Sequence, residues 1–402
     1  MAHHFSPECL ERMRTVLGGF VDRGEVPGLV ALVSQGEDVH VEALGTQSFG
    51  GKPMKRDAIF RIASMTKPLA AAAAMILVEE CKLRLDDPVD EFLPELANRK
   101  VLRRLDAPLD DVVPAKRVIT LRDLLTFTWG FGLVMAWPPA FPVQKAMQAA
   151  GLMPSPNPIE HTPDDYMKRL GALPLMHQPG EKWMYHTGSD VLGVLIARAA
   201  GQSFSDFLRE RIFAPLGMRD TDFHVPADKL ERFTTSYMRD PATKKLNVHD
   251  DPRASRWSKP PPFASGGGGL VSTADDYLAF CRMMLGKGRY GRARILSPAS
   301  VALMTMDHLT DAQKQGMEAF FGDGHGGFKE GWGFGMSIEI KRTDLWANPG
   351  RFGWTGGVGT TAYSDPSENL AGILLTQRMM DSPVPPRVMT DFWTLVYQAL
   401  EE

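Results

Sequence analysis

The chain has 402 residues, with 45 Lys and Arg against 48 Asp and Glu, so its formal net charge is −3. Apolar residues make up 44% of it and charged residues 23%, the composition of a soluble globular protein long enough for two or three domains. The charges nearly cancel and the sequence contains no cluster of basic residues, so we expect no nucleic-acid partner. The longest apolar run, Leu69 to Val78, is far shorter than the roughly 20 residues of a membrane-spanning helix, so we expect no membrane partner either.

The first thirty residues predict an amphipathic surface helix, because charged side chains are spread through them in place of the apolar core of a secretory signal. Unless a leader was removed before this numbering begins, that predicts a cytoplasmic protein. The three widely spaced cysteines, Cys9, Cys81 and Cys281, argue against a disulfide framework or a zinc site. No H-E-x-x-H or comparable cluster of ligands occurs, so we expect neither a metal nor a cofactor.

A β-hairpin is predicted next, from residues 28–34 and 39–44 around a turn at 35–38. A long helix follows that begins at or just before Ser64, because Pro68 is tolerated in a helix only within its first turn. The body of this helix, Ala70 to Glu80, is rich in helix-forming residues and has little polar face. We therefore expect it to be buried in the middle of the molecule.

The middle of the chain indicates helical segments joined by loops. The stretch from Trp129 to Pro163, rich in Pro, Met and aromatic residues, predicts a long loop that is either a surface insertion or a lid over a pocket. Four glycines at 266–269 lack the spacing of a phosphate-binding loop and predict a bend or a close backbone approach. Ser272 or Thr273 is expected to cap a helix that runs to Leu285. Further helices are expected at 121–126, 164–170, 189–200 and 203–212.

Strands return near the C-terminus, at 333–341, 357–364 and 370–377, before an amphipathic helix at about 387–400. Strands at both ends of the chain with helices between them predict an α/β (α+β) fold, in which one sheet is built from the two termini. The predicted division is a discontinuous sheet domain, residues 1–85 and 264–402, and a mostly helical domain inserted into it, residues 86–263.

Ser64-Met65-Thr66-Lys67 is the one Ser-x-x-Lys of the sequence, and on a helix its two end residues share one face. A serine hydroxyl needs an adjacent base to act as a nucleophile, and a partly buried lysine with a lowered pKa can be that base. A serine at a helix start also offers its own N–H to an oxyanion. Since about one such tetrapeptide is expected by chance, a plain capping role for Ser64 is the alternative.

The segment Phe60 to Pro68, FRIASMTKP, resembles the active-site helix of the serine β-lactamase and penicillin-binding-protein superfamily, most closely its family VIII carboxylesterase branch. Two more motifs of that superfamily follow in the same order. Residues 183–193, WMYHTGSDVLG, are similar to the element that supplies a tyrosine, and residues 353–357, GWTGG, are similar to the Trp-x-Gly strand of the esterases. Residues 124–130 and 269–273 also look familial, so the resemblance spans nearly the whole chain.

The resemblance implies a β-lactamase/transpeptidase-like fold with a central antiparallel sheet, and a carboxylesterase that needs no cofactor. It implies that Ser64 forms an acyl-enzyme while Lys67 and Tyr185 serve as general base and acid. Which of the two takes the serine proton stays open, since protons in a coupled pair belong to the pair. The oxyanion is expected between the N–H groups of Ser64 and Gly357. The other residues expected around the oxyanion and the substrate are Gly356, Trp354, Trp129 and Trp183.

Two of these residues could instead have a purely structural role: Tyr185 as a core residue and Trp354 as a packing residue on its strand. His186, the neighbour of Tyr185, could point away from it and is not expected to act in catalysis. No Gly-x-Ser-x-Gly occurs, which excludes a nucleophile of the α/β-hydrolase type.

Two departures from the superfamily pattern bear on the substrate. Thr187 stands where many members have Asn, and the third motif has no lysine, so that Arg351 is the nearest cation there. A site built around a fixed anion binds poorly without its cation, so penicillin-type substrates are expected to be poor and small to medium uncharged acyl esters good. The alternatives are an amide or β-lactam hydrolase or an acyltransferase of the same fold, and a scaffold without turnover. The sequence is compatible with a homo-oligomer.

Overall fold

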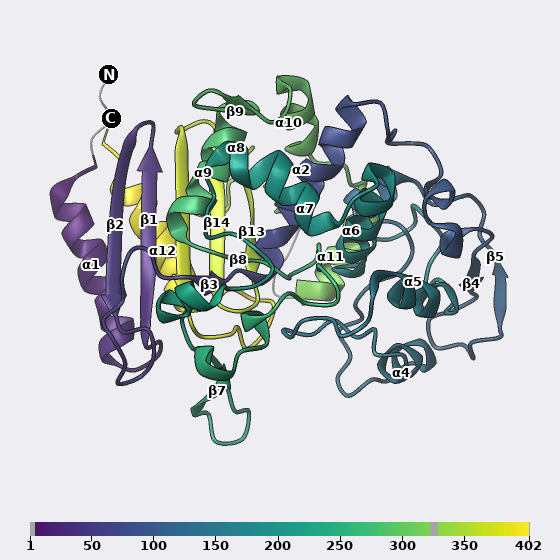
Figure 1. The fold of residues 1–402 in the computed structure, drawn as a ribbon, viewed down its shortest axis with the longest axis horizontal. Coiled ribbons are helices and arrows are strands. Elements are labelled where there is room, and N and C mark those ends of the chain that lie inside the picture. Colours follow the sequence, from purple (N-terminus) through teal and green to yellow (C-terminus); the bar gives the residue numbers. More distant parts are fainter. Residues whose placement is uncertain (1–4, 322–328, 402) are drawn as a thin grey trace.

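The computed structural model describes residues 5–321 and 329–401, and its centre is a seven-stranded antiparallel sheet (Figure 1). The strand order is β11-β12-β13-β14-β15-β1-β2, so the N-terminal hairpin is hydrogen-bonded to the C-terminal strands. The strands are β1 (Gly28–Gln35), β2 (Asp38–Gly45), β11 (Glu330–Trp332), β12 (Ser337–Glu339), β13 (Phe352–Gly356), β14 (Thr360–Asp365) and β15 (Leu370–Thr376).

The two faces of the sheet are covered by different helices. Along β1 the side chains alternate: Leu29, Ala31 and Val33 pack with helices α1 (Pro7–Asp22) and α12 (Arg387–Gln398), while Val30 and Leu32 belong to the main core on the other face. Both faces are therefore buried, which explains why residues 28–33 of this strand are apolar without interruption. The main core continues from the sheet through α2 (Thr66–Glu79) and α9 (Ala274–Leu285) into the helices beyond.

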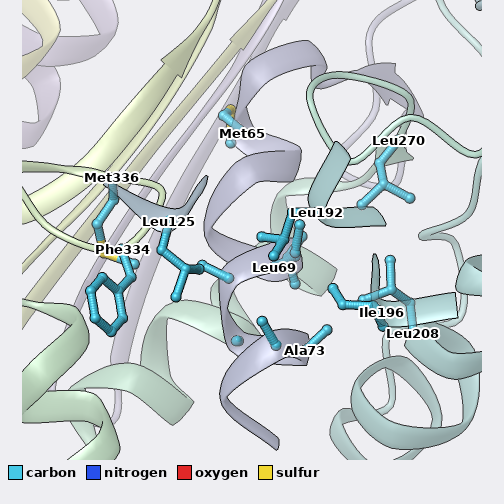
Figure 2. Packing of buried hydrophobic residues seen from close by; sticks show 14 of the residues in the cluster. Met65, Leu69, Ala73, Leu125, Leu192, Ile196, Leu208, Leu270, Phe334 and Met336 are labelled. Carbon is cyan, nitrogen blue, oxygen red and sulfur yellow. The ribbon is translucent and has the colours of Figure 1, made fainter. Parts of the chain in front are cut away.

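Helix α2 lies at the centre of this core. Its residues from Thr66 to Leu77 are all buried, and its run of alanines lets neighbouring elements approach closely. In Figure 2 the labelled Met65, Leu69 and Ala73 lie between two groups of apolar side chains. One group is Leu125, Phe334 and Met336, and the other is Leu192, Ile196, Leu208 and Leu270. The prediction of a long buried helix is confirmed.

The remaining helices lie mainly on the side of the molecule away from α1 and α12 (Figure 1). They are α3 (Leu121–Leu125), α4 (Pro142–Ala149), α5 (Pro163–Gly171), α6 (Thr187–Ala200), α7 (Phe204–Leu208), the π-helical turn η4 (Arg209–Phe213), α8 (Ala214–Leu216), α10 (Pro298–Met304) and α11 (Asp311–Phe321). Among the described residues, four short strand pairs lie outside the large sheet: β3 (Phe60–Arg61) with β8 (Val271–Ser272), β4 (Lys100–Leu102) with β5 (Val112–Pro114), β6 (Ser236–Arg239) with β7 (Leu246–Asp250), and β9 (Arg289–Tyr290) with β10 (Ala293–Arg294).

The predicted mixed α/β fold with a central antiparallel sheet is confirmed, and several local expectations are corrected. The strand expected at 333–341 is broken, because Gly333 N–H donates to the carbonyl of Met336 in a tight turn between β11 and β12. The loop expected between Trp129 and Pro163 contains helix α4, which Pro142 begins. The two-domain division, with boundaries at 85/86 and 263/264, stays a prediction.

Candidate active site

Ser64 lies in a short 3₁₀ turn, η1 (Ala63–Met65), that leads directly into α2. The turn is fixed from several sides: Thr66 Oγ1 donates to the carbonyl of Ala63 at 2.7 Å and accepts from the N–H of Leu270 at 3.2 Å. Tyr277, from α9, donates its hydroxyl proton to the carbonyl of Met65 at 2.9 Å. The serine hydroxyl is thus held on a rigid support at the head of a buried helix.

Lys67 is fully buried one turn further along, with its amine directed at Ser64. Its Nζ lies 2.9 Å from Ser64 Oγ, 2.5 Å from the carbonyl oxygen of Gly267 and 3.3 Å from Nδ1 of His186. Burial lowers the pKa of Lys67 from 10.5 to about 7, although the negative charge of Asp190 works in the opposite direction. A large share of the amine is therefore neutral, and able to accept a proton, near neutral pH.

Tyr185 faces the same pair, from the segment just before α6. Its ring centroid lies 4.7 Å from Lys67 Nζ, and its hydroxyl oxygen accepts a hydrogen bond from the indole N–H of Trp354 at 2.6 Å. Burial raises the pKa of Tyr185 well above its usual value, while hydrogen bonds with Ser64 and Trp354 work against that rise. The phenol therefore already holds its proton at neutral pH, and the group beside Ser64 that can accept a proton is Lys67.

Strand β13 brings Trp354 to the nucleophile through a close backbone approach at Gly356. A Cβ atom on Gly356 would lie 2.3 Å from the carbonyl oxygen of Ile62, so only glycine lets the strand lie against the turn that holds Ser64. The next residue, Gly357, lies in the β13–β14 turn, and a Cβ atom there would have no neighbour within 4 Å. The Trp-x-Gly sequence thus combines a side chain aimed at Tyr185 with a glycine that permits the contact.

A cavity of about 460 Å³ opens beside these residues and is lined by Ser64, Tyr185, Trp354 and Gly357 among others. Its walls are mostly apolar, and include Leu133, Met135 and Phe320. Its charged lining residues are Lys329, Glu330, Glu339 and Asp344, one cation against three acids. Burial, together with the nearby Glu330, raises the pKa of Glu339 to about 8.

The model of the Beta-lactamase family matches residues 13–389, nearly the whole chain. The protein belongs to the β-lactamase family. The uncharacterized protein MT1414 of Mycobacterium tuberculosis is 40% identical over 373 residues, which are 90% of this chain and 88% of that one. Esterase EstB of Burkholderia gladioli is 30% identical over 370 residues, 87% of this chain and 85% of EstB. The solved structure of EstCE1, "a hydrolase with promiscuous acyltransferase activity", superposes with a TM-score of 0.78 at 25% identity and covers 97% of this chain and 98% of EstCE1.

In this β-lactamase-family protein the expected site residues lie at the nucleophile and its cavity, in the main core, or behind the cavity wall. Ser64, Lys67, Tyr185 and Trp354 come together, and Gly357 lines the same cavity. The expectation for Trp129 needs correction: it is completely buried in the main core beside Phe131 and does not line the cavity. Its segment simply continues into the helical core.

Trp183 and Gly356 also stand behind the cavity wall and not in it. Trp183 is buried and stacks on Tyr185 with ring centroids 5.6 Å apart, so it supports the tyrosine and has no face toward the cavity. Gly356 is the point of closest approach described above, and the neighbouring Thr355 and Gly357 line the cavity in its place.

His186 and its partner Asp190 also lie at the site, a placement that was not predicted from the sequence. His186 Nε2 lies 3.3 Å from Asp190 Oδ2, and Asp190 Oδ1 accepts hydrogen bonds from Ser265 at 2.5 Å and from the N–H of Gly267 at 3.0 Å. The four-residue spacing of His186 and Asp190 at the start of a predicted helix was the one available signal. The four-glycine segment does make the expected close backbone approach, and it supplies a carbonyl to Lys67.

Within residues 5–321 and 329–401, no group of three or more His, Cys, Asp and Glu side chains is arranged to hold a metal ion. None of the helices in those same ranges combines the length and the apolar character that a membrane crossing requires.

Proposed function

We propose that this protein is a serine carboxylesterase of the family VIII type, in which Ser64 is the nucleophile, Lys67 the general base and Tyr185 the proton carrier to the leaving group. The observation that carries the proposal is the 2.9 Å contact between Ser64 Oγ and the Nζ of a fully buried lysine. The pKa of that lysine, about 7, lies where a general base works best near neutral pH. A lysine that only stabilised the fold would not need to be held uncharged beside a serine.

Acylation begins when neutral Lys67 accepts the hydroxyl proton of Ser64 and the oxygen attacks the ester carbonyl carbon. The carbonyl oxygen becomes an oxyanion, which the N–H groups of Ser64 and Gly357 are expected to bind. When the tetrahedral intermediate collapses, the bond from carbon to the alcohol oxygen breaks. That oxygen takes a proton from Tyr185, and Tyr185 is reprotonated by the Lys67 ammonium.

Deacylation repeats these steps with water as the nucleophile. Lys67 is neutral again once the alcohol has left, so it can accept a proton from water through Tyr185 as the water oxygen attacks the acyl carbon. The Ser64 oxygen then leaves and recovers its proton from the same pair, which restores the starting state. The hydrogen bond from Trp354 to the Tyr185 oxygen supports this shuttle, because it stabilises the phenolate that forms while the proton passes.

The charges around the cavity favour neutral or cationic esters over anionic ones. Arg351, the nearest cation in sequence to the third motif, is only 1% exposed, lies 3.3 Å from Glu339 and is stacked over the ring of Tyr363. It is therefore committed to the core and does not offer a carboxylate site. With Glu330 and Asp344 against Lys329 in the lining, the carboxylate of a penicillin-type substrate would meet a net negative charge there and be repelled.

An acyltransferase is the second candidate, because two of the relatives favour it. EstCE1 is described as a hydrolase with promiscuous acyltransferase activity, and Acyltransferase mokF of Monascus pilosus is 29% identical over 378 residues. The same acyl-enzyme would serve both activities, with a second alcohol in the place of water. The open cavity beside Ser64 gives room for such an acceptor.

Three rates test the proposed function: hydrolysis of p-nitrophenyl butyrate, hydrolysis of a chromogenic cephalosporin, and transfer of the butyryl group to an added alcohol. Wild type, Ser64→Ala and Ser205→Ala are compared, the last as a serine on helix α7, away from the site. We expect ester hydrolysis by wild type and by Ser205→Ala, and a loss of at least about 10³-fold in Ser64→Ala. Faster cephalosporin turnover than ester turnover would overturn the esterase assignment, and alcohol transfer that outpaces hydrolysis would make the protein an acyltransferase.

A further inference from the structure

His186 has a backbone conformation that is rare for a residue with a side chain. Its φ is +84° and its ψ −67°, and the N–H of Thr187 hydrogen-bonds to the carbonyl of Tyr185 at 3.3 Å, which together make a γ-turn centred on His186. Such a conformation is unfavourable for a residue with a side chain and persists only where its surroundings enforce it. Here it lets two adjacent residues, Tyr185 and His186, both face Lys67.

The hydrogen bonds around His186 determine which ring nitrogen carries the proton. Asp190 is a carboxylate whose other oxygen is already occupied by Ser265 and Gly267, so it acts as an acceptor toward His186. His186 therefore carries its proton on Nε2, where it donates to Asp190, and its Nδ1 has a lone pair that faces Lys67 Nζ at 3.3 Å. Burial and the charge of Lys67 lower the pKa of His186, which keeps the ring in this neutral form.

This arrangement decides where the lone pair of a neutral Lys67 points. A neutral amine has two N–H bonds and one lone pair, arranged roughly as a tetrahedron with the side chain. Lys67 has three polar neighbours: the Gly267 carbonyl and His186 Nδ1, which accept, and the hydroxyl of Ser64, which can donate. With both N–H bonds directed to the two acceptors, the lone pair is left for Ser64.

We propose that His186 is a positioning residue, which holds one N–H of neutral Lys67 so that the lysine lone pair faces the hydroxyl of Ser64. The inference rests on the proposed function in that Ser64 is the nucleophile, and it adds the device that orients its base. Asp190 acts through His186 by fixing the tautomer that leaves Nδ1 as an acceptor. His186 itself touches neither the substrate nor the reacting serine.

Several charged or titratable groups face His186 and influence how its protonation depends on pH. Lys67 on α2 and Asp190 on α6 are in contact with the ring. Tyr185 packs edge-on against the ring, with centroids 5.8 Å apart. Tyr166, Glu160, His161 and Arg256 line, with His186 and Asp190, a separate cavity of about 330 Å³. The variants below change the contacts of the ring with Lys67 and Asp190.

The chain offers a closely matched pair of variants, His186→Asn and His186→Leu. The Asn oxygen occupies the place of the histidine Nδ1 and can accept from Lys67, whereas Leu has nearly the same shape as Asn and no acceptor. The probe is the rate at which an uncharged p-nitrophenyl phosphonate labels Ser64, because labelling reports activation of the serine without requiring ester turnover. We expect His186→Asn to label within about tenfold of wild type and His186→Leu about 10²-fold more slowly.

The pH dependence separates positioning from a purely structural role. A loss of the acceptor removes a stabilising partner of the Lys67 ammonium, so the pH at which labelling reaches half its maximum falls in His186→Leu and stays near wild type in His186→Asn. Asp190→Asn serves as a second variant if Leu prevents folding, which thermal unfolding will show. Its amide reverses the favoured histidine tautomer, so labelling slows although His186 is still present.

Equal labelling rates for the Asn and Leu variants, or a Leu variant that labels at the wild-type rate with an unmoved pH profile, would overturn the inference. Wild-type labelling without turnover of any ester would contradict the esterase function and leave the labelling series as a valid test of His186. Failure of the phosphonate to label wild-type Ser64 at all would overturn both.

Discussion

Replacement of Lys67 by Met tests whether the lysine is held uncharged in the folded protein. Methionine has a similar length and flexibility but no charge, so it fills the same buried space. In the folded state the pKa of Lys67 is about 7, and in the unfolded chain it returns to about 10.5. Between these two pH values the unfolded chain binds one more proton than the folded protein does.

That difference gives the sign and the size of the effect. Because the unfolded state binds more protons, the free energy of unfolding of wild type rises with pH from about 7 to about 10.5. Below pH 7 the full penalty applies, about 5 kcal/mol at 1.36 kcal/mol for each tenfold change in proton affinity. From pH 7 to pH 9 alone, the stability of wild type should rise by about 2 kcal/mol relative to Lys67→Met.

The assay is urea unfolding of both proteins at several pH values in that range, followed by circular dichroism. The comparison uses the change with pH, so the constant cost of the lost hydrogen bonds to Ser64 and Gly267 cancels. Other groups that titrate in this range, Glu339 among them, are present in both proteins. Lys55→Met, at an exposed position, is the control and should run parallel to wild type. Parallel curves for wild type and Lys67→Met would mean that the folded protein does not lower the pKa of Lys67.

Three further outcomes are expected from the same site. The value of kcat/KM for a neutral ester should rise with pH through about 7, as Lys67 loses its proton, and a flat profile from pH 5 to 9 would count against this base. Trp354→Phe removes the donor to Tyr185, so kcat should fall about tenfold with a smaller change in KM. An unchanged kcat in steady-state kinetics would show that this hydrogen bond does not assist catalysis. Gly356→Ala should lower stability by about 1–3 kcal/mol, because its Cβ would lie 2.3 Å from a backbone carbonyl. Gly357→Ala, with open space at its Cβ, is the matched control in thermal unfolding and should stay within about 0.5 kcal/mol of wild type.

The parts of the fold that could be predicted from the sequence are those with a local pattern. The β1–β2 hairpin pairs Gln35 with Asp38 around the expected turn, and Thr273 caps α9 as one of the two residues expected to do so. Helix α2 was predicted from Pro68 and the alanine run alone. In each case the residues that specify the element lie within it or beside it.

The strands β11 and β12 were not predicted correctly because their pattern is not local. β11 and β12 have three residues each, and their turn is set by contacts with other elements: the N–H of Gly335 donates to the carbonyl of Leu125. A Cβ atom on Gly335 would lie 2.8 Å from the carbonyl oxygen of Lys67, so the close packing against helix α2 requires a glycine here. Nothing in the neighbouring sequence reports such a constraint.

The candidate site divides in the same way. Ser64 and Lys67 are three residues apart on one helix, so their meeting could be expected from spacing. The bond between Trp354 and Tyr185 joins residues 169 apart, and the contact between Lys67 and His186 joins residues 119 apart. Both depend on how β13 and α6 pack against α2, which is a property of the folded core. The same packing takes Trp129 out of the cavity, although its aromatic character suggested a wall.

The most direct test of the central claim is the mass of the protein after reaction with an uncharged p-nitrophenyl phosphonate ester. We expect wild type to gain one phosphonyl group, which peptide mapping will place on Ser64, and Ser64→Ala to gain none under the same conditions. The same mass gain in Ser64→Ala, or a label that maps to another residue of wild type, would contradict a nucleophilic Ser64 activated by Lys67.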